Sequence, residues 1–470
     1  MKLTRREVVA GAAAGVLGAA GIYELVERLG ETPGRPAGGP RGREQHLLDG
    51  VRVVRDNDVE VLVPPLHHQV VTARVDVEPR RAALREAQAA LEDALRSLDE
   101  RFEPTPSGVN VTVAWGLPYF RRYVSRSAAG HLPVDVRASR AKGRRTPALL
   151  DAIRFGSDTP ETILEKNDVA VLIRSDVRRH VDEAADALFG RALGVFRPTS
   201  IRKGFVGGGF DGGRSLPKRM AVAAGIPGAE LVPDTAELFL GFTSSQKAGL
   251  GPPRIANFET LGLVDLGPRG YFRGGTHMHL SHLFEDLEAW YLNFDHDERI
   301  ATTFAPGVKA PPGTQTVAQP PEDAASATQV SRQFHRFGAI GHSTAIQTTS
   351  RLAEAVTGPD GTVYPKGTAI PRREDFNTLD NPFFWTTSPE VDRYRPEPAA
   401  GIHFVVFNPS SDDFHRNRRA MDGVLPDGTK LPLAAGDRAQ GINSVLETTH
   451  RQNFLVPPRA HRSFPLVELL

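Results

Sequence analysis

The sequence contains no cysteine among its 470 residues. Disulfide bonds, thiolate nucleophiles, iron–sulfur clusters and cysteine-ligated metals are therefore excluded. The chain also lacks a G-x-S-x-G motif, which excludes the serine nucleophile that this motif presents. The remaining candidates for chemistry are serine, threonine, carboxylates and the histidines, which are concentrated in the second half of the chain.

An excess of charge of one sign is absent as well. The 57 basic and 56 acidic side chains give a net charge of +1, so no nucleic acid or strongly acidic partner is expected. The hydrophobic fraction of 40% and the charged fraction of 24% are typical of a soluble globular protein. The length favours two domains.

The N-terminus carries the features of an export signal. Thr4, Arg5 and Arg6 precede a weakly apolar run, Val8–Tyr23, which is short for a spanning helix of ~20 residues. We predict that residues 1–30 are a twin-arginine signal or, because no A-x-A cleavage site stands out, a retained anchor. The Gly/Pro-rich residues 31–45 are predicted to be a flexible tether.

Strands and helices alternate after residue 50, which predicts an α+β fold. β-Branched runs predict strands, and Ala and Leu at three- and four-residue spacing predict a long helix at 79–102. We expect an N-terminal domain at 46–200, a Gly/Pro-rich segment between the domains at 201–260, and a C-terminal domain at 261–470. The predicted strands are 59–66, 69–77, 108–116, 168–176, 276–283 and 401–409.

The segment "THMHLSH" invites a metal interpretation. In a strand, however, His277 and His279 share one face and His282 lies on the other, so a packing or surface role is favoured. His342 is different, because it stands among small and apolar residues directly after Gly341, which would let a flat ligand approach.

The stretch "GFVGGGFDGGR", residues 204–214, supports two interpretations. Gly207, Gly209 and Gly212 form G-x-G-x-x-G, which is typical of a dinucleotide site between a strand and a helix. Gly208–Gly212 form G-x-x-D-G, which would present the carboxylate of Asp211. The helix predicted after this loop is short and contains Pro217, so the dinucleotide interpretation is disfavoured.

The order of these pieces resembles that of the dye-decolorising peroxidases. The resemblance covers almost the whole chain after the tether and is carried by "VNVTVAWGLPYFRR", "GGFDG", "GGTHMHLSHLFEDLEAW", "GHSTAIQTTSR", "IPRREDFN" and "GIHFVVFNPSSDDFHRNRR". It implies two ferredoxin-like domains, each an antiparallel sheet covered by helices, in a barrel-like sandwich.

By this resemblance, the cofactor is haem b and His342 is its axial ligand. Asp211 would be the distal acid and Arg372 the distal arginine, with Arg373 of the same pair as the alternative. Further cofactor contacts are implied for Gly208, Gly209, Gly212, Arg351 and Arg373. A second alignment of the glycine-rich stretch with the family's motif stays open. In this alignment Phe205 takes the position that is usually aromatic in the family, and Gly207 replaces the acid.

The function implied is an exported peroxidase that uses hydrogen peroxide to oxidise phenolic or dye-like donors. The alternative is a haem-binding member of the same fold without peroxidase activity. The expected partners are peroxide, an aromatic donor and the twin-arginine export machinery, while homo-oligomerisation is left open. Electrons could be relayed by aromatic side chains, namely Trp115, Trp290, Tyr291 and Trp385.

Overall fold

The structure is a computed structural model, and it describes residues 22–32, 34–56, 59–209, 213–242, 258–313, 326–381, 398–433 and 438–470. Asp211, Gly212 and Trp385 lie outside these residues, as does most of the predicted export signal. None of the helices within the described part is both long and apolar enough to cross a bilayer.

The first half forms a four-stranded antiparallel sheet with two helices. In chain order the elements are β3 (His67–Val75), α4 (Arg81–Arg101), β4 (Asn110–Gly116), β7 (Val169–Ser175), α7 (Arg178–Phe189) and β8 (Phe196–Phe205). The strands lie in the order β8-β3-β7-β4, as expected of a ferredoxin-like unit.

The second half repeats this order. Strand β10 pairs with β16 on one side and β15 on the other, and β15 pairs with β13 and β14. The strands are β10 (Thr276–Glu285), β13 (Arg372–Arg373), β14 (Phe376–Thr378), β15 (Gly401–Asn408) and β16 (Leu446–Val456). The helices are α9 (Leu287–Asn293), α10 (His296–Thr303), α11 (Ala327–Phe337), α12 (His342–Ser350) and α13 (Ser411–Met421).

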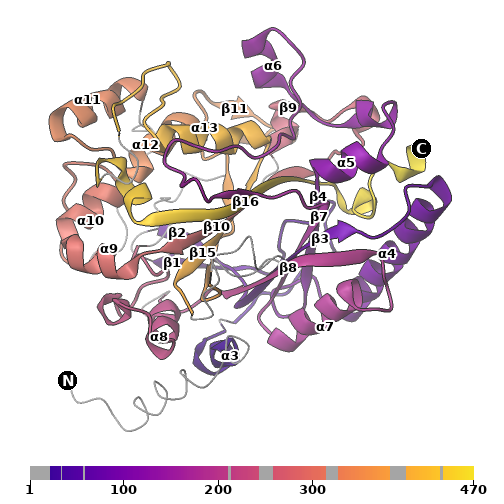
Figure 1. Ribbon diagram of the computed structural model, residues 1–470, viewed down its shortest axis with the longest axis horizontal. Coiled ribbons are helices and arrows are strands. Elements are labelled where there is room, and N and C mark those ends of the chain that lie inside the picture. Colours follow the sequence, from indigo (N-terminus) through magenta and orange to yellow (C-terminus); the bar gives the residue numbers. More distant parts are fainter. Residues whose placement is uncertain are drawn as a thin grey trace.

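The two sheets join at both edges into a closed barrel. Asn377 of β14 pairs with Phe205 of β8, and Phe454 and Leu455 of β16 pair with β4. Helices α4 and α7 lie outside one half of the barrel, and α9 to α13 lie outside the other half (Figure 1). The prediction of two ferredoxin-like antiparallel sheets covered by helices is therefore confirmed.

Side chains alternate between the barrel interior and the helical layer. The interior holds an apolar cluster that includes Val70, Leu172, Met278, Val405 and Phe454. Residues one position away along the same strands face the helices instead. This alternation decides which polar side chains can meet, because the barrel wall separates the two sets.

Shorter elements connect the barrel to its surroundings. They are α3 (Glu24–Leu29), β1 (Arg52–Asp56), β2 (Val59–Val63), α5 (Leu117–Tyr123), β5 (Val134–Asp135), α6 (Val136–Lys142), β6 (Ile163–Leu164), α8 (Leu216–Ala223), β9 (Val264–Asp265), β11 (Val356–Thr357) and β12 (Val363–Tyr364). The predicted boundary at residue 200 lies inside β8 (Phe196–Phe205).

The segment predicted to be a flexible tether, 31–45, is fixed to the barrel in its described residues. Arg35 forms an ion pair with Asp176 at 2.8 Å and donates to two carbonyl oxygens. Gln45 is fully buried and exchanges hydrogen bonds of 2.8–2.9 Å with Val113. Its glycines and prolines suggested a free linker, whereas its described polar residues Arg35 and Gln45 find partners distant in sequence.

Candidate functional site

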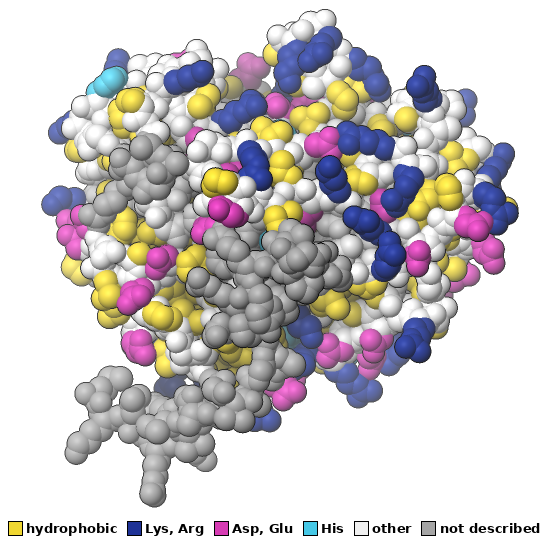
Figure 2. All heavy atoms as spheres, viewed as in Figure 1, with side chains coloured by type: hydrophobic (Ala, Val, Ile, Leu, Met, Phe, Trp, Pro, Cys, Tyr) yellow, Lys and Arg dark blue, Asp and Glu magenta, His cyan; other side chains and the backbone are white. Residues whose placement is uncertain are grey.

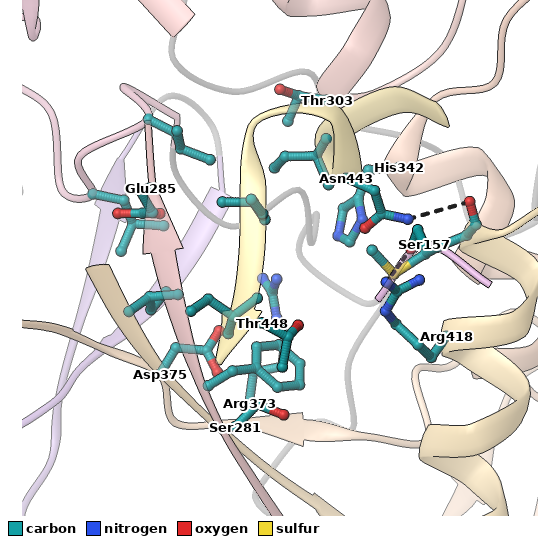
Figure 3. Close-up of a pocket in the computed structure, with 18 of the residues that line it drawn as sticks. Ser157, Ser281, Glu285, Thr303, His342, Arg373, Asp375, Arg418, Asn443 and Thr448 are labelled. Atoms are coloured by element: carbon teal, nitrogen blue, oxygen red, sulfur yellow. Dashed lines mark hydrogen bonds between the residues drawn. The ribbon is translucent and has the colours of Figure 1, made fainter. Parts of the chain in front are cut away.

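A cavity lies between the barrel wall and the helices of the second half (Figure 3). It encloses about 1160 Å³ of space free of protein atoms, part of which is open to solvent. The walls are mainly apolar, and they are formed by Leu238, Leu240, Phe242, Leu283, Phe304, Ile402, Phe404, Phe414, Met421, Ile442 and Leu446.

His342 enters the cavity from the first turn of α12. Gly341, the N-cap of this helix, lies against Phe304 at the end of α10, where an added Cβ would lie 2.4 Å from the carbonyl oxygen of Phe304. Burial, with Arg373 and Arg418 nearby, lowers the pKa of His342 to about 3, so its imidazole is neutral. Its Nδ1 atom is buried without a hydrogen-bond partner among the described residues.

Arg372 and Arg373 lie on opposite faces of β13. Arg372 is paired in register with Phe407, which faces the barrel interior, and Arg373 is paired with Val406, which faces the helices. Arg373 therefore lines the cavity beside His342, and Arg372 does not. The guanidinium of Arg372 instead contacts Glu374 at 2.5 Å inside the barrel.

Two carboxyl groups line the same cavity on the side of the sheet. Asp375 follows Arg373 by two residues and shares its face, and Glu285 ends β10 (Figure 3). Burial raises the pKa of Asp375 to about 7, against the opposing effect of Arg373. Burial and the charge of Asp375 raise the pKa of Glu285 to about 8. Oδ1 of Asp375 and Oε2 of Glu285 are buried without hydrogen-bond partners in the described part of the chain.

The wall beside α13 carries two further arginines. Arg418 pairs with Asp422 at 2.5 Å, and Arg451 of β16 pairs with Asp158 at 2.5 Å. Asn443 also donates to Asp422, at 3.3 Å. This wall is therefore cationic but already balanced by carboxylates, whereas Arg373 lies close to Asp375, whose pKa is raised.

The remaining predicted site residues lie elsewhere. Arg351 caps the end of α12, where burial and Arg373 lower its pKa to about 10, but it is not among the residues that line the cavity. Gly208 and Gly209 adopt φ values of +69° and +77°. A Cβ at Gly208 would lie 2.3 Å from the carbonyl oxygen of Arg214, and one at Gly209 would lie 2.5 Å from that of Thr235.

These two glycines therefore permit close contact between backbone segments, and neither lines the His342 cavity. Gly207 and Gly208 line a separate cavity that also includes Arg35 and Asp176. Asp211 and Gly212 lie outside the described residues, so the choice between Asp211 and Gly207 as the acid position stays a prediction.

The "THMHLSH" segment forms part of β10, and the predicted division of its histidines between two faces is confirmed. His279 stacks on Phe414 and its Nδ1 lies 2.6 Å from Oδ1 of Asn453. His282 faces the barrel interior, where its ring centroid lies 4.1 Å from that of His403. No group of three or more potential ligands in the described chain could hold a metal ion.

Asp375 and Glu285 are the cavity residues that the sequence-based interpretation missed. Asp375 could have been found, because its spacing of two from Arg373 places both on one face of an extended segment. Glu285 gave a weaker signal, an acid directly before Asp286, which caps α9. Nothing local distinguishes Arg451, since its contact with Asp158 spans 293 residues.

Comparison with known proteins supports the fold. A model of a family of unknown function (DUF7405) matches residues 65–458. No curated protein matches the chain. A DyP-type peroxidase from Cellulomonas bogoriensis has a TM-score of 0.51 and 16% identity over 91% of this chain and 100% of its own. DyPB from Rhodococcus jostii RHA1 has a TM-score of 0.46 and 14% identity over 86% of this chain and 96% of its own.

At these identities the likeness to solved structures establishes the fold and not the activity. The family model covers most of the chain, including the whole barrel and its helical layer. The chain therefore belongs to the family of unknown function DUF7405, and its fold is that of the DyP-type peroxidases.

Proposed function

We propose that this protein is a haem-dependent peroxidase of the dye-decolorising type, in which His342 would hold the iron of haem b. The observation that carries the proposal is the combination of a mainly apolar cavity with a partly buried, neutral imidazole whose buried Nδ1 has no partner among the described residues. Neutral imidazole is the form of histidine that ligates metals.

The residues of the cavity fit the group. A porphyrin presents a broad apolar ring, which the leucine and phenylalanine walls would cover, and carboxylates, which arginines can bind. His342 would hold the iron, and Arg373, Arg418 and Arg451 are the cations within reach of the cavity. Bound haem would supply the oxidation–reduction chemistry with peroxide.

The side chains of the sheet wall would handle the protons. With a pKa of about 7, Asp375 exists in both protonation states near neutral pH, so its free Oδ1 can accept a proton and return it. Arg373 carries a fixed positive charge beside it and favours an anion in the cavity. Asp211, which the family resemblance implies as the distal acid, is a second candidate for the same task.

The proposal extends to substrate and location. Hydrogen peroxide is the proposed oxidant, and phenolic or dye-like molecules are the proposed electron donors, by analogy with the DyP-type fold. The Thr4-Arg5-Arg6 motif supports export by the twin-arginine route. Of the proposed relay aromatics, Trp115 and Trp290 are fully buried and donate to backbone carbonyls, which also suits a packing role.

Haem binding is tested by adding haem b to the full chain and recording the visible spectrum. We expect a Soret shift for the wild type and for His335→Ala, which removes an exposed imidazole from α11, but not for His342→Ala. The same spectrum from His342→Ala and wild type would refute the axial assignment. Haem binding without peroxide-dependent dye oxidation would favour the non-catalytic alternative.

The acid is identified by comparing Asp375→Asn with Asp211→Asn. If Asp375 acts as the base, dye oxidation rises as pH increases through about 7, where this carboxyl loses its proton, and Asp375→Asn abolishes that rise. A loss confined to Asp211→Asn would assign the task to Asp211. The Soret band of each variant shows whether haem is retained.

A further inference from the structure

A second hollow, a groove in the surface, lies where the two halves of the chain meet at β6 and β16. Residues of both halves line it, among them Arg74 near the end of β3, Arg121 and Arg122 of α5, Lys166 after β6, and Asn453 of β16. The groove encloses about 1210 Å³ of space free of protein atoms, part of which is open to solvent. It shares no lining residue with the His342 cavity.

Both carboxylates that line this groove are already neutralised. Asp151 pairs with Arg121 at 2.7 Å, and both side chains are exposed to solvent. Glu165 contacts Arg202, whose side chain is fully buried in the barrel. These two carboxylates therefore do not balance the other basic side chains of the groove.

The unbalanced positive charge belongs to Arg74 and Lys166. Both residues are exposed, and neither forms an ion pair with any residue in the described part of the chain, whereas Arg122 contacts the buried Asp168. Arg74 is also paired in register with the exposed Arg197 of β8. Like charges directly opposite one another destabilise a sheet, and a bound anion would relieve that repulsion. Figure 2 shows basic side chains gathered around the place where Figure 1 has α5.

The groove offers apolar surface beside these charges. Leu117 and Pro118, at the start of α5, and Leu164 of β6 line it as partly buried side chains. Guanidinium groups also stack on aromatic rings, as well as binding carboxylates and sulfonates. A molecule with a flat aromatic body and an anionic group would therefore use both kinds of surface, whereas a simple inorganic anion would leave the apolar wall uncovered.

Contacts between side chains join this groove to the wall of the His342 cavity. Asn453 lines the groove, and its Oδ1 lies 2.6 Å from Nδ1 of His279. The ring of His279 stacks on Phe414, which lines the cavity. Arg451, two residues before Asn453 and on the same face of β16, lines the cavity as well. A molecule in the groove would therefore lie close to the cavity without entering it.

We propose that this groove binds an aromatic molecule with a carboxylate or sulfonate group and holds it as the electron donor. The proposal rests on the proposed peroxidase function, because the electron needs haem oxidised by peroxide as its acceptor. Two phenolic donors would each lose one electron and one proton, and one hydrogen peroxide would take these up to form two water molecules. Arg74 and Lys166 would bind the anionic group of the donor.

Binding is tested on the full chain without added haem. Syringate, a phenol with a carboxylate, and its uncharged methyl ester are titrated into the protein by calorimetry at low salt. We expect syringate to bind ~5-fold more tightly than the ester, and Arg74→Gln and Lys166→Gln each to weaken its binding ~2–5-fold, as for exposed charge pairs. Added salt should weaken the binding of syringate further, because it screens exposed charges.

Arg28→Gln is the matched control. Arg28 is an exposed arginine of α3, which lies well away from α5 in Figure 1, so this variant should bind syringate as the wild type does. Thermal midpoints equal to that of the wild type show that each variant is folded. Equal affinities for syringate and its ester, or an unchanged affinity in Arg74→Gln/Lys166→Gln, would overturn the site. Acetate binding as tightly as syringate would overturn the aromatic class of ligand.

The donor role is tested with haem bound and hydrogen peroxide present. Arg74→Gln/Lys166→Gln should raise the KM for syringate more than the KM for its methyl ester, because only syringate carries the charge that these side chains bind. The same ratio of the two KM values in wild type and double variant would overturn the donor role. If the proposed function fails, neither donor is oxidised, whereas the calorimetric titration still shows whether the groove binds the aromatic anion.

Discussion

Glu374 bridges two arginines inside the barrel, the buried Arg174 and the partly buried Arg372, and its removal should destabilise the fold. It contacts Arg174 directly, and it lies 2.5 Å from Nε of Arg372. The side chain of Arg174 is 1% exposed and that of Glu374 is 6% exposed. Burial lowers the pKa of Arg372 to about 9, which shows how costly its charge already is.

Glu374→Gln keeps the shape of the side chain but leaves both guanidiniums without this counter-charge. Breaking a buried ion pair by removing one partner costs ~3–5 kcal/mol, because an uncompensated charge stays in a medium of low polarity. We expect a loss of this size in the free energy of unfolding, measured by urea titration at pH 7. Glu288→Gln, at an exposed position on α9, should change stability by less than ~0.5 kcal/mol.

A second substitution distinguishes loss of charge balance from loss of packing. Arg174→Met in the Glu374→Gln background removes one of the two stranded charges, so part of the lost stability should return. A loss below ~1 kcal/mol for Glu374→Gln, well under that range, would refute the placement of Glu374 and Arg372 inside the barrel. It would also reopen Arg372 as a residue of the cavity.

Two further predictions concern stability. Tyr23→Phe should lower the free energy of unfolding by ~1–3 kcal/mol, because the buried amide of Leu379 loses its partner and the carbonyl of Lys203 and the amide of Asp380 keep only Thr378. An unchanged thermal midpoint would contradict the docking of α3. The fold raises the pKa of Glu285 from its ordinary value of 4.5 to about 8. Between these two pH values the folded chain holds a proton that the unfolded chain releases, so the free energy of unfolding falls as pH rises from about 4.5 to about 8. At ~1.4 kcal/mol per pKa unit, Glu285→Gln should abolish up to ~4–5 kcal/mol of this pH-dependent loss. The prediction would be contradicted if the midpoints of urea unfolding changed equally with pH in wild type and Glu285→Gln between pH 5 and 9.

The order of strands and helices within each half could be predicted from sequence because those elements are long and locally patterned. The strand β7 is a continuous buried run, and α4 repeats Leu84, Leu91, Leu95 and Leu98 on one face. The closure of the barrel could not be predicted in the same way. It depends on one residue pair between β14 and β8 and two between β16 and β4, and contacts this few leave no sequence pattern.

The tether shows a different limit. Gly and Pro are abundant in residues 31–45, and that composition is typical of a linker. The segment is fixed by Arg35 and Gln45, whose partners Asp176 and Val113 lie in strands and loops distant along the chain. Composition reports how flexible an isolated peptide would be, whereas a few buried polar contacts determine whether it stays free in the folded protein.

The four residues Arg372 to Asp375 explain why the site was only partly predictable. Spacing alone shows that Arg372 and Glu374 share one face of an extended segment and that Arg373 and Asp375 share the other. Which face lies toward the cavity depends on the register between β13 and β15, where Arg373 is paired with Val406. A slip of one residue in this register would exchange the two pairs between the faces of the strand. Arg372 and Glu374, which stabilise the barrel as an ion pair, would then line the cavity in place of Arg373 and Asp375. The buried partner Arg174 opposes that slip, because it fixes Glu374 inside the barrel. The interior ion cluster therefore does more than stabilise the fold: it sets the register that presents Arg373 and Asp375 to His342.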